Sequence, residues 1–89
     1  MKIKEGFKLR AVGNEYIVSG EGLQQINFNK LISLNSSAAY LWQQIESKEF
    51  NKQTLADLLT TKYNISDEQA LADATDVANN WIEAGIVEK

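Results

Sequence analysis

The 89-residue sequence predicts an α+β fold in which an N-terminal antiparallel sheet of three or four strands precedes three α-helices. Three observations carry this prediction. Apolar and polar residues alternate along much of residues 1–34, as they do in half-buried strands. Apolar residues then recur at helical spacing through most of the remaining chain. Where the two patterns meet, Asn35 is a residue type that favours the start of a helix.

The strands are predicted as a hairpin and a third strand. Phe7–Val12 alternates, Gly13-Asn14 suits a tight turn, and residues 15–18 resume the alternation. A glycine-rich break follows, and residues 25–34 are compatible either with a second hairpin around Asn29, in which residues 22–29 form an extra strand, or with one long bent strand. Leu31–Leu34 then predicts a strand with alternate side chains on opposite faces.

The first two helices are each predicted to begin directly after an asparagine. Residues 36–46 follow Asn35 and place apolar residues on one face. A second helix is predicted to begin after Asn51 and to end at Asn64, which can adopt the left-handed conformation of a helix stop.

The third helix has the clearest start. Ser66 and Gln69 match a capping box, in which each side chain satisfies a backbone N–H of the first turn. Gly85 suits the residue that ends the helix, and residues 86–87 can add a short strand. The whole chain, residues 1–89, is therefore interpreted as one domain.

Composition excludes several functions. The chain contains no cysteine and no histidine, so it lacks disulfides, thiolate or imidazole metal ligands and the usual groups for nucleophilic and acid–base catalysis. The carboxylates do not have the spacing of a calcium loop. We therefore expect no catalytic residues, no bound metal and no cofactor. Neither a membrane-spanning segment nor a signal segment is evident, which favours the cytoplasm.

The order of elements also resembles a winged helix-turn-helix domain, a fold that often binds DNA. DNA binding is therefore one hypothesis for the function. Duplex binding requires Lys or Arg on the inserted helix. Residues 66–88 contain no basic residue and six acidic ones, and the net charge of the chain is −3. This charge pattern argues against a nucleic-acid partner, and a purely structural interaction module is the remaining alternative.

Three segments resemble the PqqD-like peptide chaperones, which are recognition domains of systems that modify ribosomally made peptides. They are residues 34–42, which read LNSSAAYLW, residues 50–64, and Asp73 with residues 81–87, which read WIEAGIV. The resemblance implies a non-catalytic adaptor that binds the leader part of a precursor peptide by strand addition. It also implies that the adaptor presents the peptide to a modifying enzyme, often a radical SAM protein.

The resemblance places the peptide in a cleft between the third strand and the third helix. The peptide-binding residues that it predicts come from these two elements. They are Lys30, Leu31, Ile32, Ser33 and Leu34 of the strand and Ala70, Asp73, Ala74, Val77 and Trp81 of the helix.

Two interpretations of the helix stripe remain open. Helical apolar spacing is how any helix packs on a core, so Ala70, Ala74, Val77 and Trp81 can be core residues. Alternatively, the small residues leave a shallow channel for a side chain of the guest peptide. Asp73 is either a solvated surface acid or a partner for a basic residue of that peptide. The sequence does not decide whether the protein is a monomer or a dimer.

Overall fold

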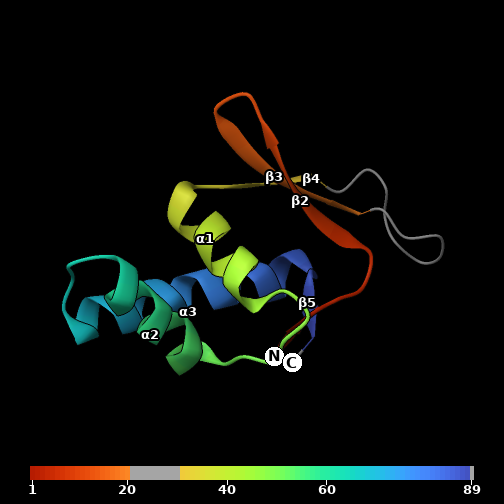
Figure 1. Cartoon of the computed structure of the whole chain (residues 1–89). Helices are drawn as coiled ribbons and strands as arrows, with labels where there is room; N and C mark the ends of the chain where they lie inside the picture. The colour runs from red at the N-terminus through yellow and green to blue at the C-terminus, as the bar shows by residue number, and fades with distance from the viewer. Residues whose placement is uncertain (21–30, 89) are drawn as a thin grey trace.

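A computed structural model describes residues 1–20 and 31–88. In this part of the chain, strands β2 (Phe7–Val12), β3 (Glu15–Gly20) and β4 (Leu31–Leu34) form an antiparallel sheet in the order β2-β3-β4 (Figure 1). The predicted hairpin and third strand of the antiparallel sheet are confirmed. The prediction for residues 22–29, and Lys30 of the predicted site, lie outside the described residues.

The β2–β3 hairpin turns at the predicted pair of residues. Val12 is opposite Glu15, so the loop contains only Gly13 and Asn14. Gly13 has a φ of 62°, and Asn14 is not among the residues with positive φ. This is the pattern of a type II′ turn, in which glycine at the first central position matches the turn to the twist of the strands.

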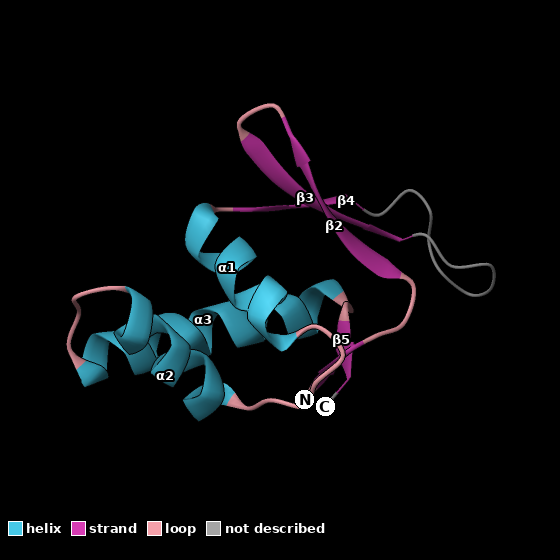
Figure 2. Ribbon diagram, in the orientation of Figure 1, coloured by secondary structure: helices cyan, strands magenta, loops and turns pink. Residues whose placement is uncertain are grey.

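A second, two-stranded sheet joins the two ends of the chain. β1 (Lys2–Ile3) pairs antiparallel with β5 (Val87–Glu88), and the Met1 ammonium donates to the Phe50 carbonyl over 2.6 Å (Figure 2). The short strand after Gly85 was predicted, but β1 was not. Both strands have only two residues, too few to show an alternating pattern, and only β5 follows a helix stop that marks its place in the sequence.

Three helices follow the sheet: α1 (Ser36–Ile45), α2 (Lys52–Lys62) and α3 (Asp67–Ala84). Each predicted N-cap is confirmed. The Asn35 side chain accepts from the Ala38 N–H at 2.8 Å, and the Asn51 side chain accepts from the Thr54 N–H at the same distance. These bonds satisfy N–H groups that have no partner inside the helix.

Two details of the predicted helix ends are wrong. Helix α2 ends at Lys62, and Tyr63 is already extended, with φ −116° and ψ 148°. Asn64 does not have the positive φ of a left-handed residue. The capping box of α3 is half formed, since Ser66 accepts from the Gln69 N–H but the Gln69 side chain donates to Asp73 instead. A complete capping box occurs at α2, where Thr54 reciprocates the bond from Asn51.

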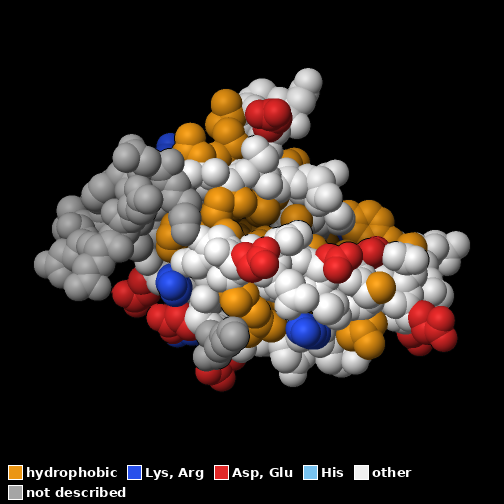
Figure 3. Space-filling model, turned by 180° about the vertical axis from the view of Figure 1, so that it is seen from behind, with side chains coloured by type: hydrophobic (Ala, Val, Ile, Leu, Met, Phe, Trp, Pro, Cys, Tyr) orange, Lys and Arg blue, Asp and Glu red, His pale blue; other side chains and the backbone are white. Residues whose placement is uncertain are grey.

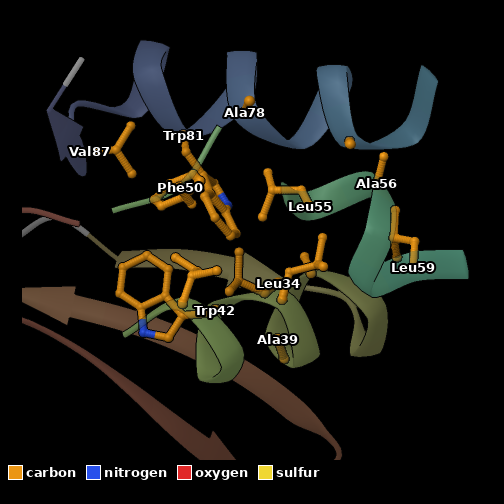
Figure 4. Packing of buried hydrophobic residues seen from close by; sticks show 14 of the residues in the cluster. Leu34, Ala39, Trp42, Phe50, Leu55, Ala56, Leu59, Ala78, Trp81 and Val87 are labelled. Carbon is orange, nitrogen blue, oxygen red and sulfur yellow. The ribbon is translucent and has the colours of Figure 1, made fainter. Parts of the chain in front are cut away.

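The core lies between α1, the pair α2 and α3, and the inner face of the sheet. Trp42 of α1 and Trp81 of α3 meet edge to face with ring centroids 5.4 Å apart, and Phe50 meets Trp81 at 6.2 Å. Figure 4 shows these rings beside Leu34 from β4 and Leu55 from α2. Such edge-to-face contacts add to the burial of the rings themselves.

Candidate functional site

Strand β4 lies at one edge of the sheet that the described residues form. It pairs with β3 on one side, from Tyr16 opposite Leu34 to Ser19 opposite Leu31. Within residues 1–20 and 31–88, no strand pairs with its other side. An unpaired edge presents backbone N–H and C=O groups to any chain that can lie beside it. None of the described strands therefore occupies the outer edge of β4, where a guest strand could pair.

The register identifies the backbone groups that point outward. In a two-residue hairpin, Val12 and Glu15 exchange backbone hydrogen bonds, and bonding alternates along an antiparallel strand. Consequently Tyr16 and Val18 point their backbone groups at β4, where they meet Leu34 and Ile32. The N–H and C=O groups of the remaining β4 residues, Leu31 and Ser33, then face the open edge.

The side chains of β4 follow the same alternation. Leu34 is buried and Ile32 is partly buried against the core. Leu31 and Ser33 are exposed, and 66% of the Leu31 surface is accessible. The strand is thus anchored by one face, while the residues with outward backbone groups keep their side chains in solvent.

A groove begins where β4 ends. It has a volume of about 480 Å³ and runs between the first turns of α1, the end of α2 and one face of α3. Figure 3 shows the molecule from behind, where acidic side chains border hydrophobic ones across the middle of the surface. The groove is lined by Asn35, Ser37, Leu41, Leu59, Tyr63, Ile65, Asp73, Asp76, Val77 and Asn80.

Helical geometry explains the α3 wall of the groove. Asp73, Asp76, Val77 and Asn80 are spaced as i, i+3, i+4 and i+7, so they share one face of the helix over about 10 Å. The core face of α3 lies beside them. Ala70, Ala74 and Ala78 are completely buried and Trp81 is 2% exposed.

The rim of the groove is acidic. Asp73 and Asp76 line it, and no Lys or Arg is among its lining residues. The Gln69 side chain donates to the Asp73 carboxylate at 2.8 Å, which holds this carboxylate near one end of the groove. The buried Leu41 and Leu59 with the partly buried Val77 supply an apolar floor.

Tyr63 forms the wall at the end of α2. Its ring meets Tyr40 edge to face at 6.4 Å, and the Lys62 ammonium lies 4.7 Å from the centre of the Tyr40 ring. A cation at this distance from an aromatic face is attracted by the ring. Tyr63 also lines a second, smaller cavity of about 230 Å³, together with Tyr40 and Lys62.

The structure separates the predicted site residues into groups. Asp73 and Val77 line the groove, and residues 31–34 form the strand at the edge of the described sheet. Ala70, Ala74 and Trp81 lie in the core, as the core interpretation of the stripe expects. They position the helix and do not line the groove.

Several lining residues were not predicted. Asp76 and Asn80 follow from Asp73 and Val77 by helical spacing, so the sequence carried a signal for them. Leu41, Leu59 and Tyr63 belong to other helices, and only the packing of α1, α2 and α3 brings them together.

In the residues that the structure describes, no cluster of three or more metal-ligating side chains occurs. No helix in the same part of the chain is long and apolar enough to cross a membrane.

Comparison with protein families gives a match over most of the chain. The family described as "Coenzyme PQQ synthesis protein D (PqqD)" matches residues 16–87, which include β4, all three helices and every lining residue of the groove. The chain belongs to the PqqD family. No curated protein sequence gives a match.

A solved structure shares this fold. The structure titled "TbiB1 in Complex with the TbiA(beta) Leader Peptide" superimposes with a TM-score of 0.75 at 16% sequence identity. The superposition covers 99% of this chain and 95% of that chain. The PqqD-family fold predicted from the sequence is thereby confirmed.

Proposed function

We propose that this PqqD-family protein is a non-catalytic peptide chaperone. It binds the leader segment of a ribosomally made precursor peptide by strand addition to β4 and presents the rest of the precursor to a modifying enzyme. The observation that carries the proposal is the outer edge of β4, which pairs with no strand of residues 1–20 and 31–88 and ends next to a groove along α3.

Strand addition uses the geometry of this edge. The outward N–H and C=O groups of Leu31 and Ser33 are the partners that a guest backbone needs, and such bonds supply affinity with little dependence on sequence. Side-chain pockets beside the strand supply selectivity. The groove begins at Asn35, immediately after β4, so a peptide extending past the strand would enter it.

The comparisons support a peptide as the ligand. The PqqD family match spans the strand and the groove, and the structure that shares this fold is titled as a complex with a leader peptide. We extend the same class of ligand to this chain, because the outer edge of β4 and the groove suit an extended backbone.

The partner enzyme would supply the chemistry. The chain contains no cysteine and no histidine, two of the side chains most used for nucleophilic and acid–base catalysis, which supports assigning the modification to a second protein. We propose a radical SAM enzyme in this role and the cytoplasm as the location, following the resemblance of the sequence motifs to peptide chaperones of this kind.

DNA binding is less compatible with the surface. Helix α3 contains no Lys or Arg, and Asp73 and Asp76 lie along its groove face. These charges would repel phosphates at the place where a recognition helix would have to enter a duplex.

Titration of the ¹⁵N-labelled protein with a synthetic leader peptide tests the proposal. The peptide is taken from a precursor gene adjacent to that of the chaperone. Amide signals of residues 31–34 should shift together with those of Asp73, Val77 and Asn80, and a scrambled peptide of the same composition should leave them in place. Shifts confined to other regions, or no shifts, would reject binding at this edge.

A further inference from the structure

We propose that the groove selects peptides in which a large apolar residue stands next to a lysine or arginine. The apolar side chain fills the cavity, and the cation lies against Asp73 and Asp76. This inference rests on the proposed function and assigns the chemistry of its ligand.

The apolar part of the preference comes from the floor of the groove. Leu41 and Leu59 are buried beneath it, and Ile65 and Val77 are partly buried along its walls. A volume of about 480 Å³ is within the range of cavities that enclose ligands. Filling it with an apolar side chain removes water from the accessible parts of Tyr63, Ile65 and Val77, which is the main source of binding free energy in such a pocket.

The charge of the ligand follows from the rim. Asp73 and Asp76 are one helical turn apart on the same face, and neither has an ion-pair partner in the described part of the chain. The remaining charges of α3, on Asp67, Glu68 and Glu83, are also negative. A cation at the rim is therefore attracted by the whole helix, and a carboxylate there is repelled.

The position of the pair in the peptide follows from the end of β4. The groove starts at Asn35 and Ser37, which directly follow the strand, and residues 31–34 are not among its lining residues. The apolar and basic residues of the guest should consequently lie immediately beyond the stretch that pairs with β4, and not within it.

Selection from a phage library of random short peptides tests the inference. Wild-type protein should enrich sequences with Lys or Arg beside a large apolar residue. The variant Asp73→Asn/Asp76→Asn, which keeps side-chain size and one acceptor oxygen at each position, should enrich apolar residues without the basic neighbour. The control variant Glu49→Gln/Glu88→Gln changes net charge equally at exposed positions outside both the groove and α3 and should select as wild type does.

A selected peptide then gives the size of the effect by fluorescence anisotropy. Replacing its basic residue with glutamine should weaken binding to wild-type protein by about 3- to 10-fold at low salt, as expected for one or two exposed ion pairs. The same replacement should change binding to the Asp73→Asn/Asp76→Asn variant by less than about twofold.

The outcomes separate the two proposals. Enriched peptides without a basic residue, or basic enrichment that survives in the Asp73→Asn/Asp76→Asn variant, would overturn the charge preference and leave peptide binding intact. Recovery of no peptide at all, from a library that contains every short sequence pattern, would overturn both.

Discussion

The two faces of helix α3 show how one helix serves packing and recognition at once. One face carries Ala70, Ala74, Ala78 and Trp81 and is buried. The adjacent face carries Asp73, Asp76, Val77 and Asn80 and lines the groove. In the sequence, small apolar residues on a helix are compatible with two interpretations, close packing on a core and an open channel. Here they allow close packing, and the more polar face is the one left open.

Close packing explains the buried face. Helix α2 lies against α3, and its Leu55, Ala56 and Leu59 are buried with the alanines of α3. Alanine lets two helix backbones approach closely, while Trp81 fills the wider space near Trp42 and Phe50. The buried face therefore sets the position of the helix on which the groove depends.

The largest expected difference between the faces is in how much substitutions at the neighbouring positions 80 and 81 lower the free energy of unfolding. Trp81→Ala should lower the free energy of unfolding by about 3 to 5 kcal/mol, because it removes a buried indole and leaves a cavity. Asn80→Ala, on the groove face, should change it by less than about 0.5 kcal/mol. Urea denaturation followed by circular dichroism measures both, and similar values for the two variants would contradict the division into faces.

The two faces should also differ in their response to a larger side chain, which is the opposite change to the truncation of Trp81. Ala74→Leu should cost about 1 to 3 kcal/mol, since the side chain has no space between α3 and the core. The same substitution at Ala72, which is exposed, is the matched control and should be nearly neutral. If thermal unfolding shows that both variants are as stable as wild type, position 74 borders open space after all.

The strand beside the groove face can be tested with proline. Ser33→Pro removes one outward N–H and should weaken binding of a leader peptide by about 2- to 12-fold, the value of one net hydrogen bond, without breaking the β3–β4 ladder. Ser33→Ala retains the N–H and should bind normally, as measured by isothermal titration calorimetry.

Ile32→Pro is the corresponding change at an inward N–H. It should destabilise the sheet, because the lost hydrogen bond belongs to the β3–β4 pair. If Ser33→Pro destabilises the protein and Ile32→Pro does not, the assignment of outward and inward residues is reversed.

The smallest effect is expected from an acid on the groove face. Asp76→Asn should alter the free energy of unfolding by less than about 0.5 kcal/mol, because this exposed carboxylate has no ion-pair partner among the described residues. Chemical denaturation checks this value. A loss of more than about 1 kcal/mol would mean that the groove face contributes to the fold itself.

Much of the fold could be predicted because its signals are local. The turn at Gly13-Asn14, the caps Asn35, Asn51 and Ser66, and the stop at Gly85 are confirmed. Each depends on hydrogen bonds or backbone angles within a few residues, which a short stretch of sequence can specify. The end of α2 was missed because Tyr63 adopts an extended conformation, and its ring packs on Tyr40 of another helix.

Apart from β1 and the end of α2, the sequence by itself determined the elements, their N-caps and the negative charge of α3, because these depend on neighbouring residues and on composition. Tertiary structure decided which face of α3 is covered and which residues line the groove. Leu41, Leu59 and Val77 meet there because three helices pack at one place, and their separation along the chain carries no local signal of that meeting. The pairing of β1 with β5 is likewise decided by tertiary structure, because the two strands are far apart along the chain.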